Sequence, residues 1–239
     1  MRYFDLIETF PMPGCAVCKL MLRDVERFID SLLYEYSNSE EMRAVFSASR
    51  GLCSEHGHLM RYNKQGNVLA IAKLYRATLA DVLKNLADGP GEPGTEPRTW
   101  ADRWFSGGNR VNNAPIADRL EATENCVACD VMTVYESECV QMFQRYIGEG
   151  RFRQAFEASE GLCLPHFRAV LRALTDPSDS EKFVESQRAI WRRLYDELEL
   201  FIEKQSYEYI GEPIGHEGDS WVRAILRMAG ERGVFGVRR

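Results

Sequence analysis

Apolar residues recur at three- and four-residue steps through most of the chain, which is the pattern of amphipathic helices. One such stretch covers residues 21–36 and a matching one covers 131–146, while a third pattern covers 68–86 and has its counterpart at 190–202. No stretch alternates convincingly with a period of two, and no Asn-Gly turn separates two apolar strands. The pattern predicts an all-α chain.

Turn and cap residues divide these stretches. The run Asn38-Ser39-Glu40-Glu41 predicts a capped helix start with acidic residues in the first turn, and Gly148-Glu149-Gly150 predicts a turn further along. Asp176-Pro177-Ser178 predicts a break before the last long helix. Segments 88–94 and 106–115 are rich in Gly, Pro and Asn and are predicted loops.

The sequence repeats itself. RAVFSASRGLC at 43–53 matches RQAFEASEGLC at 153–163 in register, sharing Arg, Phe, Ala-Ser and Gly-Leu-Cys. Downstream, Leu74-Tyr75 parallels Leu194-Tyr195. Matches at several places indicate a duplication, which predicts two similar helical units.

The expected architecture is an internally duplicated helical bundle with pseudo-two-fold symmetry. Residues 1–110 would form the first helical repeat and residues 111–239 the second, with three to four helices in each and the loop at 106–115 as the boundary. Both repeats would pack into one globule. A chain of 239 residues is long enough to bury such a core.

Each repeat carries a C-x2-C pair followed by a GLC-x2-H motif. A C-x2-C turn brings two thiolates to one ion, and C-x2-H adds a thiolate and an imidazole, so the two together make a Cys3His set, which is common for structural zinc. Either motif alone is a weak signal, but their ordered pairing, found twice, is a strong one. The predicted metal ligands are Cys15, Cys18, Cys53 and His56 in the first repeat, and Cys126, Cys129, Cys163 and His166 in the second.

The segments between the half-sites are long, residues 19–52 in the first repeat and 130–162 in the second. Each holds two predicted helices, so a closing helical hairpin would tie each repeat with its own Cys3His site. The motifs stand where helices are expected to begin, and helix N-termini lower cysteine pKa values and donate N–H groups to sulfur. The spacing leaves open a second pairing, in which the C-x2-C of one repeat meets the GLC-x2-H of the other.

Zinc is the expected metal, with two ions per chain, and iron–sulfur clusters are the alternative because thiolates hold these as well. Small buried cysteines repeated by duplication of a core are a third interpretation, which leaves the repeated histidine unexplained. Cys139 lies on the apolar stripe of its helix and is expected in the core. His58 and His216 are expected to be exposed.

Composition narrows the function classes. A net charge of −6 argues against a nucleic-acid-binding protein, which normally carries a basic face. No run of 18 apolar residues predicts a membrane span, and Asp5 and Glu8 interrupt the N-terminal stretch where a signal peptide would be apolar. A cytoplasmic location is expected, where thiols stay reduced and patterned cysteines more often bind metal.

No nucleophile stands with a base, and no phosphate-binding or dinucleotide-binding motif is found. A closed shell of four ligands also leaves no position for a substrate. The expected function is therefore a non-enzymatic zinc protein whose two Cys3His sites support a surface for a protein partner. An iron–sulfur protein that transfers electrons or senses redox state is the alternative, and metal storage or delivery is a third possibility.

The run Tyr-Phe-Asp-Leu-Ile-Glu at 3–8, followed by Pro-Gly-Cys-Ala-Val-Cys at 13–18 and by Gly-Leu-Cys-x-x-His, resembles an uncharacterised prokaryotic domain-of-unknown-function family with duplicated CxxC and GLCxxH motifs. Members of that family show a C-P-x-C pair, whereas Ala16 and Val127 stand at the corresponding positions here. The resemblance covers nearly the whole chain. It implies shared ligands and a helical fold, and it brings no activity with it.

Overall fold

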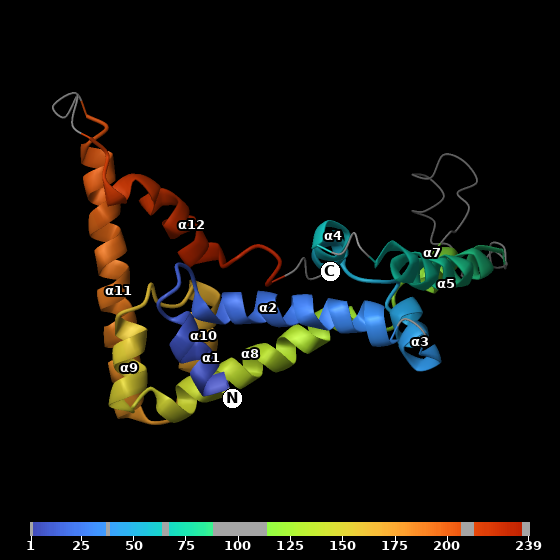
Figure 1. The fold of residues 1–239 in the computed structure, drawn as a ribbon, viewed down its shortest axis with the longest axis horizontal. Helices are drawn as coiled ribbons and strands as arrows, with labels where there is room; N and C mark the ends of the chain where they lie inside the picture. Colours follow the sequence, from blue (N-terminus) through green and yellow to red (C-terminus); the bar gives the residue numbers. More distant parts are fainter. Residues whose placement is uncertain (1, 37–38, 64–66, 88–113, 207–212, 236–239) are drawn as a thin grey trace, which may run out of the picture.

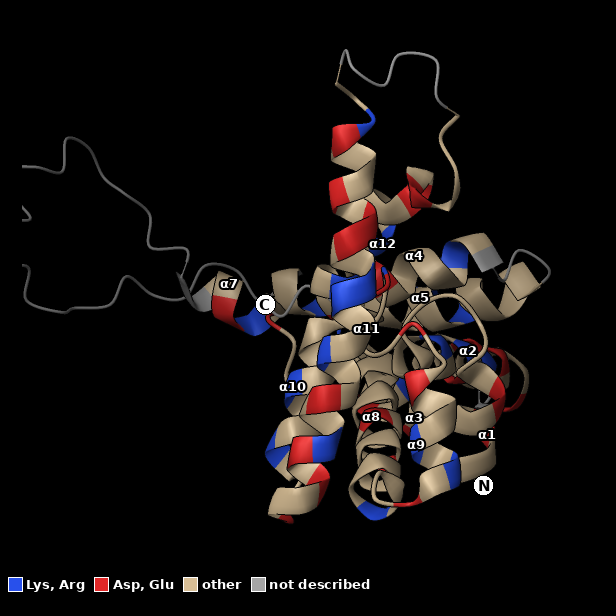
Figure 2. Cartoon of the chain, turned by 90° about the vertical axis from the view of Figure 1, so that its left-hand side faces the viewer, with Lys and Arg blue, Asp and Glu red and all other residues tan. Residues whose placement is uncertain are grey.

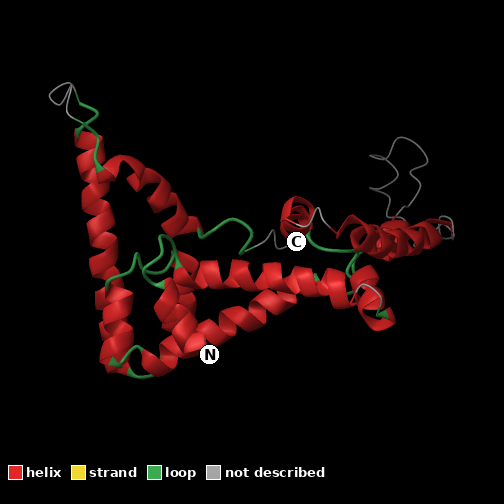
Figure 3. Ribbon diagram, viewed as in Figure 1, coloured by secondary structure: helices red, strands yellow, loops and turns green. Residues whose placement is uncertain are grey.

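The computed structural model describes residues 2–36, 39–63, 67–87, 114–206 and 213–235. Within these ranges the chain forms eleven α-helices joined by loops, with no strand (Figure 3). The predicted all-α class is confirmed. The predicted loop at 88–94 lies outside the described residues, and only the last two residues of the 106–115 loop are described, as the start of a helix.

The first part of the chain has five of these helices. They are α1 (Arg2–Thr9), α2 (Ala16–Ser31) with a π-helical continuation (Leu32–Tyr36), α3 (Glu40–Ala48), α4 (Ser54–Asn63) and α5 (Val68–Ala87). The predicted cap is confirmed, because the Ser39 side chain accepts a hydrogen bond from the backbone N–H of Met42 at 3.3 Å.

The other six helices follow residue 113. They are α7 (Ala114–Leu120), α8 (Val127–Tyr146), α9 (Gly150–Glu157), α10 (Leu164–Ala173), α11 (Pro177–Glu203) and α12 (Ser220–Ala229), the last preceded by a 3-10 turn (His216–Asp219). The predicted three to four helices per repeat were too few. Several helices, such as α1 and α9, have only eight residues, and so short a segment gives a weak periodic signal.

Helices α2 and α8 form the centre of the fold. They pack along each other and run in opposite directions (Figure 1), and the start of α2 lies near the middle of α8, where Glu136 is 3.5 Å from His166. Both helices carry buried side chains, among them Val25 and Ile29 of α2 and Met132 and Phe143 of α8. Helix α1 lies against both, α10 packs on α8, and α3 and α5 lie beyond the C-terminal end of α2 (Figure 1).

An aromatic cluster joins α1, α8, α9 and α11. Neighbouring rings within it have centroids 5.2 to 6.0 Å apart, mostly edge to face, which is the favoured geometry for aromatic pairs. The cluster consists of Phe10, Phe143, Phe152, Phe156 and Phe183. Cys139 is fully buried on α8, so its predicted place in the core is confirmed.

A buried carboxylate joins α1 to α2. Asp24 is 5% exposed and accepts hydrogen bonds from Arg2 of α1 and from Arg23, whose Nε lies 2.9 Å from Asp24 Oδ1. The Nε of Arg2 also donates to Glu138 of α8 at 2.6 Å, and its guanidinium lies over the ring of Tyr135. Such pairing is what makes a charge tolerable away from water.

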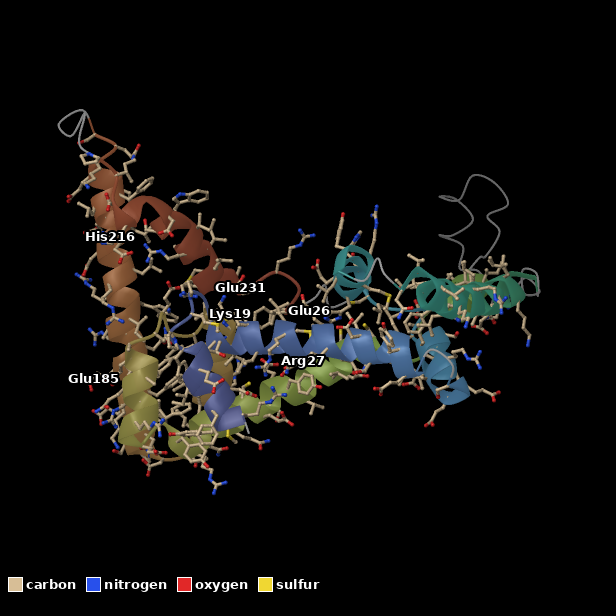
Figure 4. All side chains as sticks on the ribbon, viewed as in Figure 1. Lys19, Glu26, Arg27, Glu185, His216 and Glu231 are labelled. Carbon is tan, nitrogen blue, oxygen red and sulfur yellow. The ribbon has the colours of Figure 1, made fainter. Side chains whose placement is uncertain are left out.

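The outer faces carry both signs of charge, and Figure 2 shows basic and acidic residues interspersed along α11. His216 lies at the outer edge of the molecule with a side chain 76% exposed, as predicted (Figure 4). Among the helices that the structure describes, none is long and apolar enough to span a membrane.

Candidate metal centres

The eight cysteine and histidine residues with ligand spacing gather in two groups. In each group the four donor atoms lie within 4.8 Å of one another. One group, here named the Cys15 centre, consists of Cys15, Cys18, Cys163 and His166; the other, the Cys53 centre, consists of Cys53, His56, Cys126 and Cys129.

The expectation that each repeat is tied by its own Cys3His site was wrong. In both groups the C-x2-C pair comes from one half of the chain and the GLC-x2-H motif from the other, which is the pairing that the spacing left open. The lengths of the helices explain it. The 16 residues of α2 carry the chain about 24 Å away from Cys15, and the π-helical turn takes it further. The nine residues of α3 then recover only about 13 Å before Cys53.

The same limit applies to the second half. The 20 residues of α8 span about 30 Å, and the eight residues of α9 return about 12 Å before Cys163. Because α2 and α8 are antiparallel, the chain that leaves the end of either helix arrives near the start of the other (Figure 1). Each GLC-x2-H motif therefore meets the C-x2-C pair of the opposite half.

Both centres form where two helices begin. Cys15, Cys126 and Cys163 are the N-cap residues of α2, α8 and α10, in extended backbone conformation, and Cys53 directly precedes α4. This confirms the predicted positions of the motifs at helix starts. Two helix N-termini thus point their unpaired N–H groups and partial positive charge at each group of sulfur atoms, which favours thiolates there.

The glycine of each GLC motif makes the turn that directs the cysteine of the same motif toward its centre. Gly51 has φ +85° and Gly161 has φ +74°, a left-handed conformation that side chains with a Cβ rarely adopt. A Cβ on Gly51 would lie 2.9 Å from the ring of Tyr75, and one on Gly161 would lie 2.6 Å from the amide of Gln187. Only glycine lets these neighbours approach the turn so closely.

Gln187 of α11 fixes the second turn. It is fully buried; its Oε1 accepts the backbone N–H of Leu162 at 2.9 Å and its Nε2 donates to the Leu162 carbonyl at 3.3 Å. The sequence match of Tyr75 with Tyr195 does not extend to their contacts. Gln187 lies beside the Gly161 turn, as Tyr75 lies beside the Gly51 turn. Tyr195 is exposed instead, and its hydroxyl donates a hydrogen bond to Glu199.

In the Cys15 centre, the Nδ1 atom of His166 faces three sulfurs. It lies 3.5 Å from Cys15 Sγ, 3.4 Å from Cys18 Sγ and 3.2 Å from Cys163 Sγ, while the Sγ atoms of Cys18 and Cys163 are 3.7 Å apart. Zinc–sulfur bonds of about 2.3 Å and zinc–nitrogen bonds of about 2.0 Å predict tetrahedral edges of about 3.8 Å and 3.5 Å. The observed distances are close to those edges.

The Cys53 centre has the same geometry. The Nδ1 atom of His56 lies 3.3 Å from Cys53 Sγ, 3.6 Å from Cys126 Sγ and 3.4 Å from Cys129 Sγ. The Sγ atoms of Cys53 and Cys129 are 3.7 Å apart, far beyond the length of a disulfide bond. In both centres the histidine therefore presents one nitrogen to three sulfurs, as a fourth ligand would.

The protonation states in the Cys15 centre are coupled. Burial raises the pKa of Cys15, but hydrogen bonds with Cys163, Cys18 and His166 outweigh it and hold that pKa well below the ordinary value. The bond to Cys15 raises the pKa of Cys18 far above the ordinary value. Burial lowers the pKa of His166, yet its bonds to Cys15 and Cys163 raise it to about 10.

The Cys53 centre shows the same division of protons. Hydrogen bonds with Cys129 and then Cys53 lower the pKa of Cys126, while the bond to Cys126 raises the pKa of Cys129. Burial lowers the pKa of His56, and its bonds to Cys126 and Cys53 outweigh that and raise it to about 9. In each centre, therefore, the pKa of one cysteine is lowered while the pKa values of a second cysteine and of the histidine are raised.

The other ring nitrogen of each histidine has a different neighbour. His166 Nε2 lies 3.5 Å from a carboxylate oxygen of Glu136, and the ring of Phe235 covers the imidazole with the centroids 4.9 Å apart. His56 Nε2 lies 2.8 Å from the thioether sulfur of Met132. A carboxylate behind a ligating histidine fixes its orientation and raises its basicity, whereas a thioether is a weak acceptor.

Sequence reasoning missed these supporting residues. Glu136 and Met132 stand on α8 without any spacing that relates them to a histidine on another helix, and Phe235 follows the last helix. His58, two residues after His56, is exposed as predicted and stacks on Tyr62.

These features define a class, an α-helical protein with two groups of three thiols and one imidazole, each of which could hold a metal ion. Residues 57–233 match the model of a family described as "Family of unknown function (DUF6062)", and the chain belongs to that family. The resemblance noted from the motifs is confirmed. The matched residues include Cys126, Cys129, Cys163 and His166.

A relative from Caldicellulosiruptor sp. (strain Rt8B.4) is named "Uncharacterized 23.9 kDa protein in xynA 3'region". The two sequences are 24% identical over 229 residues, which cover 94% of this chain and 99% of the relative. No solved structure matches the chain.

Replacing Gln187 by Leu keeps the side-chain volume but leaves the buried N–H and carbonyl of Leu162 without partners. We expect the free energy of unfolding to fall by about 2 kcal/mol, measured by urea denaturation, because a buried unpaired polar group costs roughly that much. The matched control is Gln154→Leu at an exposed position of α9, with an expected change under about 0.5 kcal/mol. Equal effects of the two substitutions would contradict the role of Gln187.

Proposed function

We propose that each centre binds one zinc ion and that the two ions hold together a non-enzymatic helical scaffold. The observation that carries the proposal is the position of each histidine Nδ1, 3.2 to 3.6 Å from three cysteine sulfurs at once. Core packing alone requires no such arrangement, whereas a tetrahedral ion does. Three thiolates and an imidazole form a common ligand set of structural zinc sites.

The spread of the donor atoms favours a single ion over an iron–sulfur cluster. In a cluster with several irons the ligands bind different iron atoms, so their donor atoms spread over more than the width of one ion. Here all four donor atoms of a centre lie within 4.8 Å. Zinc is also colourless. Visible absorbance together with iron and sulfide, in protein purified without oxygen, would therefore contradict the zinc proposal and support the iron–sulfur alternative.

A closed shell of four protein ligands supports a structural role over a catalytic one, since a catalytic zinc keeps a position for water or substrate. The energies agree with that role. Structural zinc sites contribute on the order of 10–16 kcal/mol in apparent binding free energy, and a whole domain is stable by about 5–15 kcal/mol. Removal of both ions would therefore unfold the scaffold.

We infer that the two halves arose by duplication. The support comes from the matching order of motifs and from the reciprocal exchange of half-sites. Each C-x2-C pair stands at the start of a long helix, α2 or α8. Each long helix is followed by a short helix and a GLC turn, and that turn joins the C-x2-C pair of the other long helix. Two equivalent halves that exchange one element each would produce this arrangement.

An exposed apolar row on α12 is the surface that we propose for a protein partner. Trp221, Ile225 and Met228 are each about half exposed, at 52%, 57% and 51%. The opposite face turns its charges inward, where Arg223 and Arg227 pair with glutamates of α11 and of the loop before Cys163. A helix that buries its charges and exposes its apolar row is typical of an interaction surface.

Paired substitutions test the metal and the pairing together. Cys18→Ser with Cys163→Ser damages only the Cys15 centre, so about one zinc per chain is expected after dialysis against a mild chelator. Cys18→Ser with Cys53→Ser removes the same number of thiols but damages both centres, so none is expected. Pairing within each half would give the opposite result. The measurement is elemental analysis, and cobalt substitution adds the visible bands of a tetrahedral ion. An unsubstituted protein without metal would contradict the proposal.

Zinc affinity should fall as pH falls. At neutral pH the imidazole, with a pKa of about 9 in His56 and about 10 in His166, and the thiol of Cys129 or Cys18 hold protons that an ion must displace. At least two protons displaced per ion predict an affinity that falls by about 100-fold or more for each pH unit below 8. Calorimetric titration in two buffers of different ionisation enthalpy counts the protons, and release of fewer than one per ion would contradict the described protonation.

The apolar row of α12 should contribute little to the stability of the isolated chain. Trp221→Gln with Ile225→Gln is expected to lower the free energy of unfolding by no more than about 2 kcal/mol, because about half of each side chain is exposed. Phe183→Ala in the aromatic cluster is the control and should cost about 3 to 5 kcal/mol. A large loss from the α12 pair would show that the row packs within this chain, which would remove it as a partner surface.

A further inference from the structure

The two centres share their ligand types but differ in exposure. In the Cys15 centre all four ligands are buried, none more than 1% exposed. In the Cys53 centre only His56 is buried, and the three cysteines are partly exposed. A thiolate reacts faster with an oxidant when its sulfur is accessible to solvent. Only the cysteines of the Cys53 centre are accessible in this way.

The surrounding elements reinforce this difference. Helix α10, which carries His166, packs against both α8 and α12, and the segment after α12 folds back so that Val234 is buried and Phe235 covers the His166 ring. Helix α4, which carries His56, packs chiefly against α2. Local opening therefore costs less at the Cys53 centre.

Two cysteines of the Cys53 centre lie close enough to form a disulfide bond. Cys53 and Cys129 belong to different helix starts, and their Sγ atoms lie 3.7 Å apart. A disulfide needs about 2.05 Å, so a closure of less than 2 Å between two partly exposed sulfurs would form it. In the Cys15 centre the corresponding pair, Cys18 and Cys163, has the same separation but is fully buried.

We propose that the Cys53 centre is a peroxide-reactive site, at which Cys53 and Cys129 form a disulfide and the zinc ion is released, while the Cys15 centre keeps its ion. This inference rests on the proposed zinc binding and assigns a modification to one of the two sites. The ion is released because His56 and Cys126 alone remain as ligands.

The reaction balances with hydrogen peroxide as the oxidant. One thiolate sulfur attacks a peroxide oxygen, the O–O bond breaks, and the leaving hydroxide takes up a proton to become water, which leaves a sulfenic acid. The second thiolate attacks that sulfur, the S–S bond forms, and the displaced hydroxide takes up another proton. Two thiolates lose two electrons, one peroxide gains them, and two waters leave.

The disulfide would join the start of α4 to the start of α8, the same two elements that the ion joins. Oxidation therefore exchanges a metal link for a covalent one and leaves the scaffold folded. A reductant and zinc together would restore the original state.

The test uses the full chain with both ions bound. Zinc content is measured first; hydrogen peroxide is then added, and released zinc is followed with a chromogenic chelator. Free thiols are alkylated, and the peptides are mapped by mass spectrometry. One ion per chain should be released at least about tenfold faster than the second, because reaction at the buried centre needs a local opening. The mapped disulfide should join Cys53 to Cys129.

Cys139→Ser serves as the control, because Cys139 is the one cysteine of the seven that belongs to neither centre. Its release kinetics and disulfide map should equal those of the unsubstituted chain. Equal release rates for both ions, no release, or a disulfide elsewhere would each overturn the proposal. A chain that holds no zinc before peroxide is added would instead overturn the proposed function, so the two failures are distinguishable.

Discussion

The length of two antiparallel helices is the constraint on which the rest of this structure depends. Because α2 and α8 each carry the chain some 24 to 30 Å from their own C-x2-C pair, no short helix can bring the following GLC turn back to it. The turn arrives instead beside the opposite pair. The left-handed glycines and the buried amide of Gln187 then determine how the second half-site faces the first. Ligand sharing between the halves follows from helix geometry.

Much of the fold and of the candidate site could be predicted from the sequence. Periodicity located the long helices, cap residues such as Ser39 located a helix start, and motif spacing alone identified the eight residues that gather in the two Cys3His groups. The sequence did not decide which C-x2-C pair lies beside which GLC-x2-H motif. Periodicity indicates which face of a helix is buried, but not which other segment lies near the end of that helix. The lengths that decide the pairing were nevertheless present in the sequence. Contacts such as Glu136 with His166 join distant helices, and no local pattern carries them.

Identical ligand motifs do not make equivalent sites. The two groups match in donor type and in distance to within a few tenths of an ångström, yet one is sealed by α10, α12 and the segment that ends at Phe235. Burial is a property of the whole fold and cannot be read from a motif of six residues. In this protein it separates a group of four buried residues from a group with three partly exposed cysteines.

The shared ligand sets also impose an order on biosynthesis. When the first 110 residues have left the ribosome they contain half of each ligand set and no complete one. The Cys53 centre is complete once Cys129 has emerged, and the Cys15 centre must wait for His166. The contacts within these centres span up to 76 and 151 residues respectively, and the longer loop costs only about 0.6 kcal/mol more to close. Neither half carries a complete group, so all four residues of the partly exposed centre are present in the growing chain before the last residue of the buried centre is added.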